Sequence, residues 1–409
     1  MRIIYLHQYF TTPSMVGGTR SYEMARRLVR RGHEVHMVTS DRSARSTRWR
    51  ETHEAGVHVH WAPVRYSNHM GFSRRVVAFA RFASMAARRA ARLPGDLVFA
   101  TSTPLTIALP AVYAARRQSI PMVFEVRDLW PQGCVAVGSL RSPPAIAAAR
   151  QLEKFAYRNS RRIIALSEGM KEGVVAAGYP ADRVTVIPNG SDLGLFRVAP
   201  GTGREFRRRH AWLGDRPLVV YTGALGKVNG VDYLARLAAA VQKHDAEIRF
   251  LVVGTGCEEH KVRRAAEELG VLGRNFFLQA PVAKHEIPAI LSAADLATST
   301  VIDHPHLWEN SANKVFDALA AGRPVAVNHE GSLADMIRTT GCGLVLHPRQ
   351  PERSAGRLAE AIRDPPWRRQ ARRAAARLAD ERFDRDKLAA GLESVLLEAL
   401  PAAPKRRAA

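Results

Sequence analysis

The stretch of sequence best suited to chemistry covers residues 304–327 and reads HPHLWENSANKVFDALAAGRPVAV. It places two carboxylates, Glu309 and Asp317, eight residues apart on either side of a polar segment, 310–314. This segment is typical of a loop that leads into the start of a helix. Carboxylates can accept hydrogen bonds from sugar hydroxyls, and unpaired N–H groups at a helix start attract phosphate oxygens. The stretch therefore suits a ligand that contains both a sugar and a phosphate.

Two glycine-bearing loops are further candidates for holding phosphate. Gly17 and Gly18 come directly before an amphipathic helical stretch, and the loop GALGKVNG carries Gly223 and Lys227 between an apolar run and another helical stretch. Glycine lets the backbone approach a ligand closely, and a lysine beside backbone donors suits a diphosphate. Neither loop matches the Walker motif or the GxGxxG fingerprint. The alternatives are a turn that needs positive φ and, for Lys227, a solvated loop lysine.

A third group of charged residues follows an apolar run in VFEVRDLWPQ, which contains Glu125, Arg127 and Asp128. Because ligands of open α/β sheets bind at the carboxyl ends of strands, we expect these side chains to point into a binding cleft. Substrate handling and a buried aspartate paired with an arginine are both compatible with this pattern. Arg20 and Glu23, in the helical stretch after the glycine pair, are expected to be surface or capping residues.

Metal chemistry is not required by the sequence. The histidines are scattered without ligand spacing, and for His7, which ends the first apolar run, a structural or solvent role is favoured. Asp384 and Asp386 form a DxD string, but they lie in a charged, helical stretch, where we expect solvated surface. The three cysteines are far apart and odd in number, so neither a disulfide framework nor structural zinc is expected.

These residues must be positioned by an α/β fold, because short apolar runs alternate with longer helical stretches along the chain. The strands expected from the apolar runs are 3–6, 35–38, 97–100, 122–126, 163–166, 218–221, 248–253, 276–278, 296–299, 325–327 and 344–346. A segment punctuated by proline and glycine, VTVIPNGSDLGLF, separates two series of runs. The length of 409 residues likewise indicates two domains, each with a doubly wound sheet and with a cleft between them.

The composition indicates a globular protein with an anionic partner. Lys and Arg number 61 against 38 Asp and Glu, which gives a formal charge of +23 at pH 7. Nucleic acid, an anionic membrane face and a phosphorylated substrate are all compatible with this charge. No apolar run approaches the length of about 18 residues that a membrane span needs. We expect a reduced, cytoplasmic protein.

One helical stretch, residues 72–93, is strongly basic, with six arginines and no acid. The arginines fall within an arc of about 140° at helical spacing. They are Arg74, Arg75, Arg81, Arg88, Arg89 and Arg92, and the apolar residues opposite them are Phe72, Val76, Phe79 and Ala83. Such a helix can rest on anionic lipid, and Phe82 and Met85 among the arginines favour this role. The alternative is an ordinary core-packing helix with a solvated basic face.

The carboxylate stretch resembles the Glu-x7-Glu signature of family 4 glycosyltransferases, and the glycine pair, VTVIPNG, the glycine-lysine loop and AAGRPV follow in the order found in that family. The resemblance implies a GT-B fold, with two Rossmann-like domains facing each other across a cleft that holds the donor. It also implies an acceptor-binding domain over 1–190, a nucleotide-sugar-binding domain over 191–380, and a C-terminal helix over 381–409. That helix would pack back toward the first domain and end in a frayed basic tail.

Carried over to this sequence, the resemblance brings Glu309 to the donor hexose and Asp317, one methylene shorter than glutamate, to the ribose hydroxyls. Many family members have two further basic residues in the glycine-lysine loop, where this chain has Ala224 and Asn229. Lys227, together with Lys314, is therefore expected to face the diphosphate. Arg127 stands where relatives often have a histidine and Asp128 keeps its place, so with Glu309 they form the expected catalytic set. The expected donor-binding residues are Gly17, Gly18, Gly223, Lys227, Glu309, Asn310, Asn313, Lys314 and Asp317.

A closer likeness, carried by EVRDLWPQ and NSANKVFDALAAG, is to bacterial O-antigen and capsule N-acetyl-L-fucosaminyl transferases. It implies a retaining hexosyltransferase that moves an amino-deoxy sugar from a UDP-sugar to a polyprenyl-diphosphate-linked saccharide, without metal or other cofactor. The enzyme would be peripheral on the inner face of the bacterial membrane. The alternatives are a sugar-nucleotide 2-epimerase of the same architecture and a basic nucleic-acid-binding protein, although no RNA- or DNA-binding motif is present.

Overall fold

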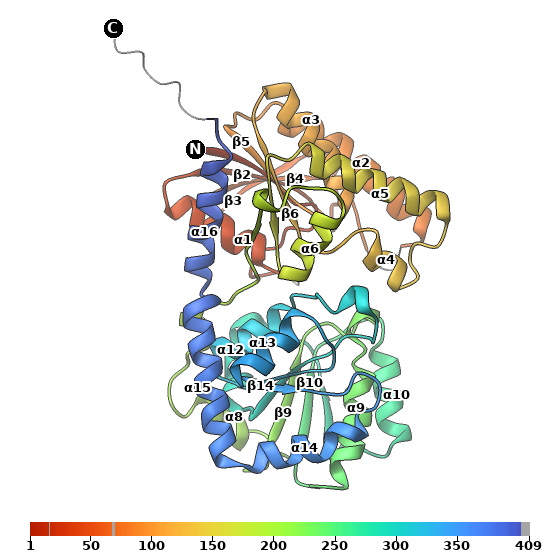
Figure 1. Ribbon diagram of the computed structural model, residues 1–409, viewed down its shortest axis with the longest axis vertical. Coiled ribbons are helices and arrows are strands. Elements are labelled where there is room, and N and C mark those ends of the chain that lie inside the picture. The colour runs from red at the N-terminus through yellow and green to blue at the C-terminus, as the bar shows by residue number, and fades with distance from the viewer. Residues whose placement is uncertain (16, 68–69, 402–409) are drawn as a thin grey trace. The chain divides into compact units, whose positions relative to one another are not determined.

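The computed structural model describes residues 1–15, 17–67 and 70–401, and it divides the chain into two compact units (Figure 1). Unit 1 contains Met1–Pro188 together with the C-terminal segment that starts at Leu388, and unit 2 contains Asn189–Lys387. The predicted domain borders, after residues 190 and 380, lie near these divisions. The basic tail beyond residue 401 lies outside the described residues.

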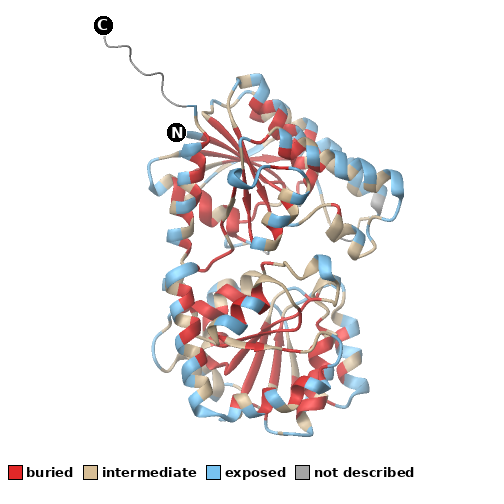
Figure 2. Cartoon of the chain, in the orientation of Figure 1, coloured by how far each residue is buried: buried red, intermediate tan, exposed pale blue. Residues whose placement is uncertain are grey.

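Unit 1 is built on an eight-stranded sheet in the order β3-β4-β2-β1-β5-β6-β7-β8. Its strands are β1 (Arg2–Leu6), β2 (Glu34–Ser40), β3 (Arg50–Glu54), β4 (Val57–Ala62), β5 (Leu97–Thr101), β6 (Met122–Val126), β7 (Arg162–Ala165) and β8 (Val184–Val186). Neighbouring strands are parallel except for the antiparallel pair β3 and β4. The central strands are buried (Figure 2), which explains why they read as continuous apolar runs.

The alternation of side chains along β1 shows how the two faces of this sheet are covered. Ile4 and Leu6 belong to a core with residues of α2, α3, α5 and α6, whereas Ile3 and Tyr5 pack with residues of α1 and α16. The helices are α1 (Arg20–Arg30), α2 (Phe72–Ala90), α3 (Ala108–Gln118), α4 (Gln132–Ala136), α5 (Pro143–Arg158), α6 (Glu168–Ala176) and α16 (Arg385–Glu398), with 3-10 turns η1 (Leu105–Ile107) and η2 (Ala181–Arg183). The last helix of the chain thus completes the first unit.

Unit 2 has a parallel six-stranded sheet in the order β11-β10-β9-β12-β13-β14. Its strands are β9 (Leu218–Thr222), β10 (Arg249–Val253), β11 (Phe276–Gln279), β12 (Leu296–Ser299), β13 (Val325–Val327) and β14 (Gly343–Val345). Its helices are α7 (Leu193–Phe196), α8 (Thr202–Arg208), α9 (Asp232–Gln242), α10 (Glu259–Glu268), α11 (Ile287–Ala293), α12 (Asn313–Ala320), α13 (Ser332–Thr340), α14 (Glu352–Arg363) and α15 (Pro365–Arg382), with 3-10 turns η3 (Lys227–Asn229), η4 (Lys284–Glu286) and η5 (Pro305–Leu307). Residues of α9, α10 and α14 form one core with the sheet, and residues of α12, α13 and α15 form another.

The strands expected from apolar runs are confirmed to within one residue at their ends, except that β2 continues two residues further, to Ser40. The sequence did not predict β3, β4 or β8. Strand β3 reads RETHE and is largely solvent-facing, so it carries no apolar signal. A tight turn at Ala55 and Gly56, with φ of 50° and 85°, joins β3 to β4 as expected of a two-residue hairpin.

Candidate active site

A buried ion pair fastens the first helix of unit 1 to its sheet. The guanidinium of Arg20 donates to Glu125 Oε1 at 2.8 Å and to the carbonyls of Ile187 and Pro188 at 2.9 and 2.7 Å. Thr101 Oγ1 donates to the other oxygen of Glu125 at 2.7 Å. Burial alone would raise the pKa of Glu125, but Arg20 and Arg127 offset that effect and lower it.

This arrangement corrects three expectations. Arg20 is 2% exposed, so it is not the surface residue that was expected. Glu125 is fully buried, so it does not point into a binding cleft as expected. Glu23 is also buried, because it accepts hydrogen bonds from Arg26 and Arg27 one turn along α1. A buried charge is tolerated when it is paired and hydrogen-bonded, so these groups have structural roles.

The carboxyl ends of β1, β5 and β6 bring His7, Arg127 and Asp128 together. Ser102 Oγ accepts from the backbone N–H of Arg127 at 2.9 Å, and Arg127 Nη1 lies 3.4 Å from His7 Nε2. Burial, aided by Arg127, lowers the pKa of His7 well below its usual value, so the neutral imidazole can accept from Arg127. The buried His7 thereby helps to fix the position of the Arg127 guanidinium.

Asp128 is the exposed member of this group. Its Oδ2 accepts from Thr103 Oγ1 at 3.4 Å, while the arginine beside it in sequence contacts His7 instead. Loss of surrounding water raises the pKa of Asp128 although the residue is open to solvent on one side, and Arg127 opposes that shift. The expected alternative of a buried aspartate paired with an arginine is therefore wrong. An exposed carboxylate at a strand end can instead meet a substrate hydroxyl.

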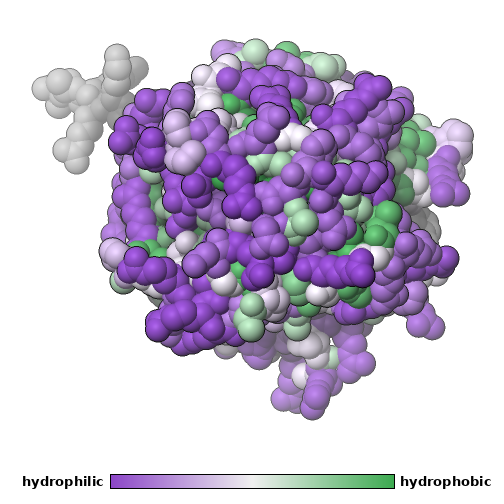
Figure 3. Space-filling model, turned by 90° about the horizontal axis from the view of Figure 1, so that it is seen from below, coloured by the Kyte–Doolittle hydropathy of each residue, from purple (hydrophilic) through white to green (hydrophobic). Residues whose placement is uncertain are grey.

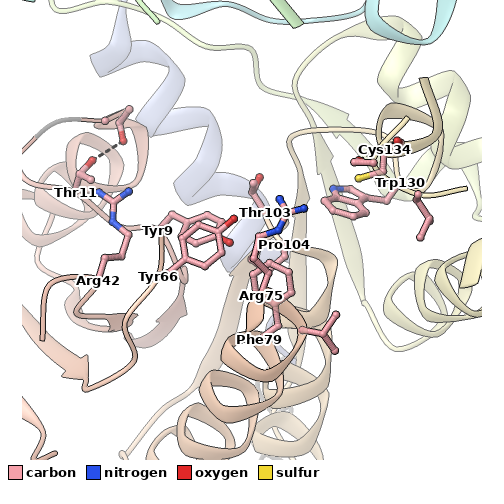
Figure 4. A pocket seen from close by; sticks show the side chains of 15 residues that line it. Tyr9, Thr11, Arg42, Tyr66, Arg75, Phe79, Thr103, Pro104, Trp130 and Cys134 are labelled. Carbon is pink, nitrogen blue, oxygen red and sulfur yellow. Dashed lines mark hydrogen bonds between the residues drawn. The ribbon is translucent and has the colours of Figure 1, made fainter. Parts of the chain in front are cut away.

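The glycine pair of unit 1 lines a cavity of about 440 Å³ (Figure 4). Thr103, which donates to Asp128, also lines this cavity. Gly17 has φ of +146°, and a Cβ there would lie 2.8 Å from Thr11 Cγ2, so the position needs glycine. Thr11 Oγ1 donates to the Gly18 carbonyl at 2.9 Å and holds the loop at the cavity wall. The loop after β1 thus contributes to a binding site in unit 1.

In unit 2, Lys314 lies in the first turn of α12 against the loop that follows β9. Its Nζ donates to Tyr221 Oη at 2.7 Å and lies 3.9 Å from the centre of that ring, while the tyrosine hydroxyl donates to the Ala224 carbonyl. A Cβ on Gly223 would come within 3.0 Å of Lys314 Cε, so glycine makes room for the lysine. Burial lowers the pKa of Lys314 to about 7.

No carboxylate among the described residues forms an ion pair with Lys314. The ammonium is instead held by a neutral hydroxyl and an aromatic face, beside the N-terminus of an eight-residue helix. Helix N-termini attract anions through their unpaired N–H groups. The surroundings of Lys314 therefore favour an anionic ligand.

Glu309 lies at the N-terminus of another helix of unit 2. Its Oε2 accepts from Ser332 Oγ at 2.5 Å and its Oε1 accepts from the Ser332 backbone N–H at 3.2 Å. Gly331 has φ of +93°, and a Cβ there would come within 2.6 Å of Glu309 Oε1, so the close approach depends on glycine. The carboxylate is partly buried and oriented, and a carboxylate has further lone pairs to offer a hydroxyl group.

Asp317 is held one turn beyond Lys314 on α12, where its Oδ1 accepts from Ser191 Oγ at 2.7 Å. Burial raises the pKa of Asp317. Asn310 and Asn313 are partly buried, and the Oδ1 atom of Asn313 is inaccessible and accepts no hydrogen bond from the described residues. The stretch 309–317 thus gathers the predicted polar residues around the start of α12.

Lys227 is placed differently from Lys314, because it is exposed on the short turn η3. The turn itself is fixed, since Thr300 Oγ1 donates to the Asn229 carbonyl at 2.6 Å and Ile302 N–H donates to the Val228 carbonyl at 2.9 Å. Lys227 therefore belongs to the connection that follows β9, whereas Lys314 belongs to the helix that follows β12. Sequence reasoning missed Tyr221 and Ser332, for which the only signal was their position beside Gly223 and Gly331.

The basic helix α2 differs from the expected arrangement. Its buried residues are Ala78, Phe82, Ala83, Ala86 and Ala90. Of the predicted apolar face, Ala83 is therefore buried, whereas Val76 is 47% exposed. The sequence had suggested that Phe82 lies among lipid-facing arginines, but Phe82 belongs to the core. The side chain of Phe72 lies outside the described residues. Arg89 is also engaged, because it donates to His60 Nδ1 at 2.8 Å and pairs with Glu51.

The described residues contain no group of histidines, cysteines and carboxylates that could hold a metal ion, and Asp386 lies exposed in the first turn of α16. Within the same residues, no helix is both long enough and apolar enough to cross a membrane. The three cysteines, which lie in the described ranges, are free.

Comparison with known proteins assigns a family to each part of the chain. Residues 17–190 match the model of a glycosyl transferase 4-like domain, and residues 203–378 match the model of glycosyl transferases group 1. The sucrose-phosphate synthase from Thermosynechococcus elongatus has a similar structure, with a TM-score of 0.81, 17% sequence identity, and coverage of 98% of this chain and 100% of that chain. By these two domains the chain belongs to the glycosyltransferases of the GT-B fold, as the sequence predicted.

Two curated relatives illustrate the range of this group. The D-inositol 3-phosphate glycosyltransferase of Frankia alni is 30% identical over 271 residues, which are 63% of this chain and 64% of that protein. The GDP-mannose-dependent alpha-mannosyltransferase of Mycobacterium tuberculosis is 27% identical over 320 residues, which are 78% of this chain and 76% of that protein. The chain thus spans less than two thirds of the length of the first of these relatives.

Proposed function

We propose that this protein transfers a sugar from a nucleotide-sugar donor to an acceptor, with the donor bound by unit 2. The observation that carries the proposal is the ammonium of Lys314, which lies beside Gly223 at the N-terminus of α12 without a carboxylate partner among the described residues. A diphosphate would supply the missing negative charge. Glu309, held by Ser332, is then suited to the hydroxyl groups of the sugar.

The chemistry required of such a site is stabilisation of the charge that develops on the departing nucleoside diphosphate. Lys314 and the N–H groups at the start of α12 are preorganised for this task, and Lys227 adds a solvent-exposed positive charge. No separate nucleophile is assigned, which agrees with front-face transfer and retention at the anomeric carbon. In unit 1, Asp128 is placed to accept a hydrogen bond from the acceptor hydroxyl, and Arg127, held by His7, supports it.

For the substrates, we propose a UDP-sugar donor, specifically UDP-N-acetyl-L-fucosamine or a related amino-deoxy hexose, and a polyprenyl-diphosphate-linked saccharide acceptor of bacterial surface polysaccharide. The support is the likeness of EVRDLWPQ and NSANKVFDALAAG to fucosaminyl transferases. The Mycobacterium relative is named for GDP-mannose, so GDP-sugars are the competing donors. No metal or other cofactor is part of the proposal.

We further propose that unit 1 rests on the inner face of the cytoplasmic membrane. Most of the large hydrophobic side chains that are exposed lie on three of its helices: Val76, Val77, Leu109, Tyr113 and Val135. Exposed arginines accompany them on α2, namely Arg74, Arg81 and Arg88. The face shown in Figure 3 is mainly hydrophilic, and its hydrophobic side chains lie mostly toward the right of the view. Apolar side chains next to arginines are suited to an anionic lipid surface.

The proposal is tested by incubating the purified protein with a panel of UDP- and GDP-sugars and a lipid-linked acceptor mimic. We expect transfer from one donor, with product retaining the anomeric configuration of the donor. Absence of transfer from every donor by folded protein would contradict the proposal. The same donors without acceptor test the epimerase, which both domain matches disfavour, because an epimerase alone would change the donor sugar.

A further inference from the structure

The amino ends of the strands in unit 2 carry a second cluster of charged side chains, away from the carboxyl ends where Lys314 lies. Asp295 directly precedes β12, and its backbone N–H donates to the Leu218 carbonyl at the start of β9 at 2.8 Å. Its Oδ2 accepts from the Leu218 backbone N–H at 3.0 Å. The side chain is 9% exposed, so this carboxylate is fixed at the base of the sheet.

Three arginines from two helices converge on Asp295. Arg207 of α8 donates to its Oδ2 at 3.0 Å. Arg372 and Arg368 of α15 (Figure 1) each have a terminal nitrogen near Oδ1, at 3.1 and 3.5 Å. Among the described residues, Asp295 is the carboxylate with which all three arginines pair, and they pair with no other. Three guanidinium groups and one carboxylate leave a local charge of +2.

Arg207 is fully used by the fold. Besides Asp295, its guanidinium donates to three backbone carbonyls, at the end of α11 and before β9, at 2.6–3.1 Å. Each of its three nitrogens therefore has an acceptor. The nearby Arg323 is held in the same way, because it donates to two carbonyls at the end of α11 at 2.7 and 3.1 Å. These two arginines have structural roles.

Arg368 and Arg372 differ from them because each has an unused donor. One terminal nitrogen of each lies near Asp295, and the other terminal nitrogen donates to no described residue. The Nε atoms are inaccessible, whereas the unused terminal nitrogens are not, and the side chains are 34% and 39% exposed. Since the two residues are four apart on α15, they occupy one face of the helix. Two guanidinium groups with free N–H donors are thus held side by side.

The surroundings of this pair favour an anion. Burial lowers the pKa of Arg372, and the neighbouring Arg368 and Arg207 lower it further, while Asp295 opposes the shift. Adjacent guanidinium groups are complementary to the oxygens of a phosphate, and a dianion would neutralise the charge of +2. None of the large hydrophobic side chains exposed in the described residues lies on α8 or α15. The surface therefore suits a soluble anion better than a lipid layer.

We infer that Arg368 and Arg372 bind the phosphate group of a small soluble molecule, at a site separate from the candidate donor residues. Asp295 holds the two guanidinium groups together, and their unused nitrogens meet the phosphate oxygens. Because this carboxylate also ties α15 to the first residue of β9, a ligand that neutralises the cluster stabilises unit 2. The inference does not depend on the proposed function, because it uses none of the residues assigned to sugar transfer.

Isothermal titration of the full-length protein with inorganic phosphate tests this inference, at about pH 8, where phosphate is a dianion, and at constant ionic strength. Sulfate and acetate are the comparison anions. We expect phosphate and sulfate to bind with a Kd of about 1 mM or lower, and acetate to bind at least tenfold more weakly, because one negative charge neutralises half of the excess. Equal affinity for acetate would overturn the assignment to a dianion. Absence of saturable phosphate binding would overturn the inference as a whole.

Two pairs of matched variants locate the site. Arg372→Gln should weaken phosphate binding about 10- to 100-fold, as expected for a lost charge-assisted hydrogen bond, and Arg373→Gln should leave it within threefold. Arg368→Gln and Arg369→Gln form the second pair, with the same expectation. Arg369 and Arg373 are exposed on α15 and have no ion pair among the described residues. Equal losses within each pair would mean diffuse attraction to a basic helix and would refute the site.

The variants should fold, because in each of them Asp295 keeps Arg207 and one arginine of α15. Thermal denaturation checks the expected stabilisation: phosphate should raise the melting temperature of the wild type and of Arg373→Gln, and should raise that of Arg372→Gln much less. An equal rise in all three proteins would contradict a site on Arg372.

Two further arms exclude other sources of binding. Lys314→Met removes the cation of the proposed donor site and should leave phosphate affinity within threefold. Loss of binding in Lys314→Met, with Arg372→Gln unaffected, would assign the phosphate to the donor site and overturn the inference. Vesicles of phosphatidic acid and phosphatidylcholine present the same group on a lipid. Binding to these vesicles that depends on Arg372, without binding of inorganic phosphate, would overturn the soluble ligand.

Discussion

The two units use the same layered α/β frame, but one buried basic side chain in each of them is accommodated differently. In unit 1, Arg20 and Glu125 neutralise each other, and the histidine beside Arg127 is neutral. In unit 2, Lys314 has neither an anion beside it among the described residues nor full exposure to water. The contrast between these two side chains separates a structural charge from a functional one: the paired Arg20 stabilises its unit, whereas Lys314, which has no carboxylate partner among the described residues, is available to a ligand.

The largest expected effect is on the stability of unit 1. Arg20→Met leaves Glu125 buried without its partner, which should lower the free energy of unfolding by about 3–5 kcal/mol, measured by denaturant titration. The double variant Arg20→Met/Glu125→Gln removes both charges and should recover much of that loss. If Arg20→Met unfolds no more readily than the wild type, this pair is not structural and the comparison between the units fails.

The corresponding change in unit 2 should affect catalysis and spare stability. Lys314→Met should reduce kcat about 10²- to 10³-fold, the usual cost of losing one preorganised donor to the leaving group. Its melting temperature should equal or exceed that of the wild type, because the charged form of Lys314 is disfavoured by burial. A marked loss of stability with normal turnover would assign Lys314 a structural role instead.

The pH dependence of donor binding should sharpen the same contrast. Burial lowers the pKa of Lys314 to about 7, so the lysine loses its charge as the pH rises through 7 in the free protein. A diphosphate favours the ammonium and raises this pKa, so the affinity for a nucleoside diphosphate should fall by up to about tenfold per pH unit from pH 7 to 9.

Lys314→Arg keeps its charge over this range and should show a flat profile by isothermal titration. The stability of the wild type should have the opposite slope to its affinity. The unfolded lysine holds its proton up to about pH 10.4, so the free energy of unfolding rises with pH above 7. A wild-type affinity that is independent of pH would remove Lys314 from contact with the diphosphate.

The smallest expected effect concerns the other predicted lysine of unit 2. Lys227 is exposed on η3, so Lys227→Ala should weaken donor binding less than about fivefold, as for a solvent-exposed ion pair worth roughly 0.2–1 kcal/mol. The effect should decrease further at high salt. A loss as large as that of Lys314→Met would show that η3 rearranges when the donor binds.

Most of the buried parallel strands could be located along the chain because they are continuous apolar runs, and the residues around Glu309 and Lys314 could be found because glycines mark the loops that follow strands. The order of the strands within each sheet was not predicted. The pairing of Arg20 with Glu125 could not be predicted, because 105 residues separate the two partners and the local sequence pattern favours a surface arginine. The phase of α2 was also misjudged. Four alanines, at 78, 83, 86 and 90, are buried on it together with Phe82, and alanine gives little hydrophobic contrast from which to predict the buried face.

The return of the chain to its starting unit affects the order of assembly during synthesis. Ile3 and Tyr5 are covered on one face by Ala389, Leu392 and Leu396 of α16, which is made after all the other described elements of both units. Until α16 is released from the ribosome, the amino-terminal sheet carries an uncovered apolar strip, the kind of surface that chaperones recognise and that promotes aggregation. A stop codon before α16 would therefore destabilise unit 1, most of which is synthesised first, rather than unit 2.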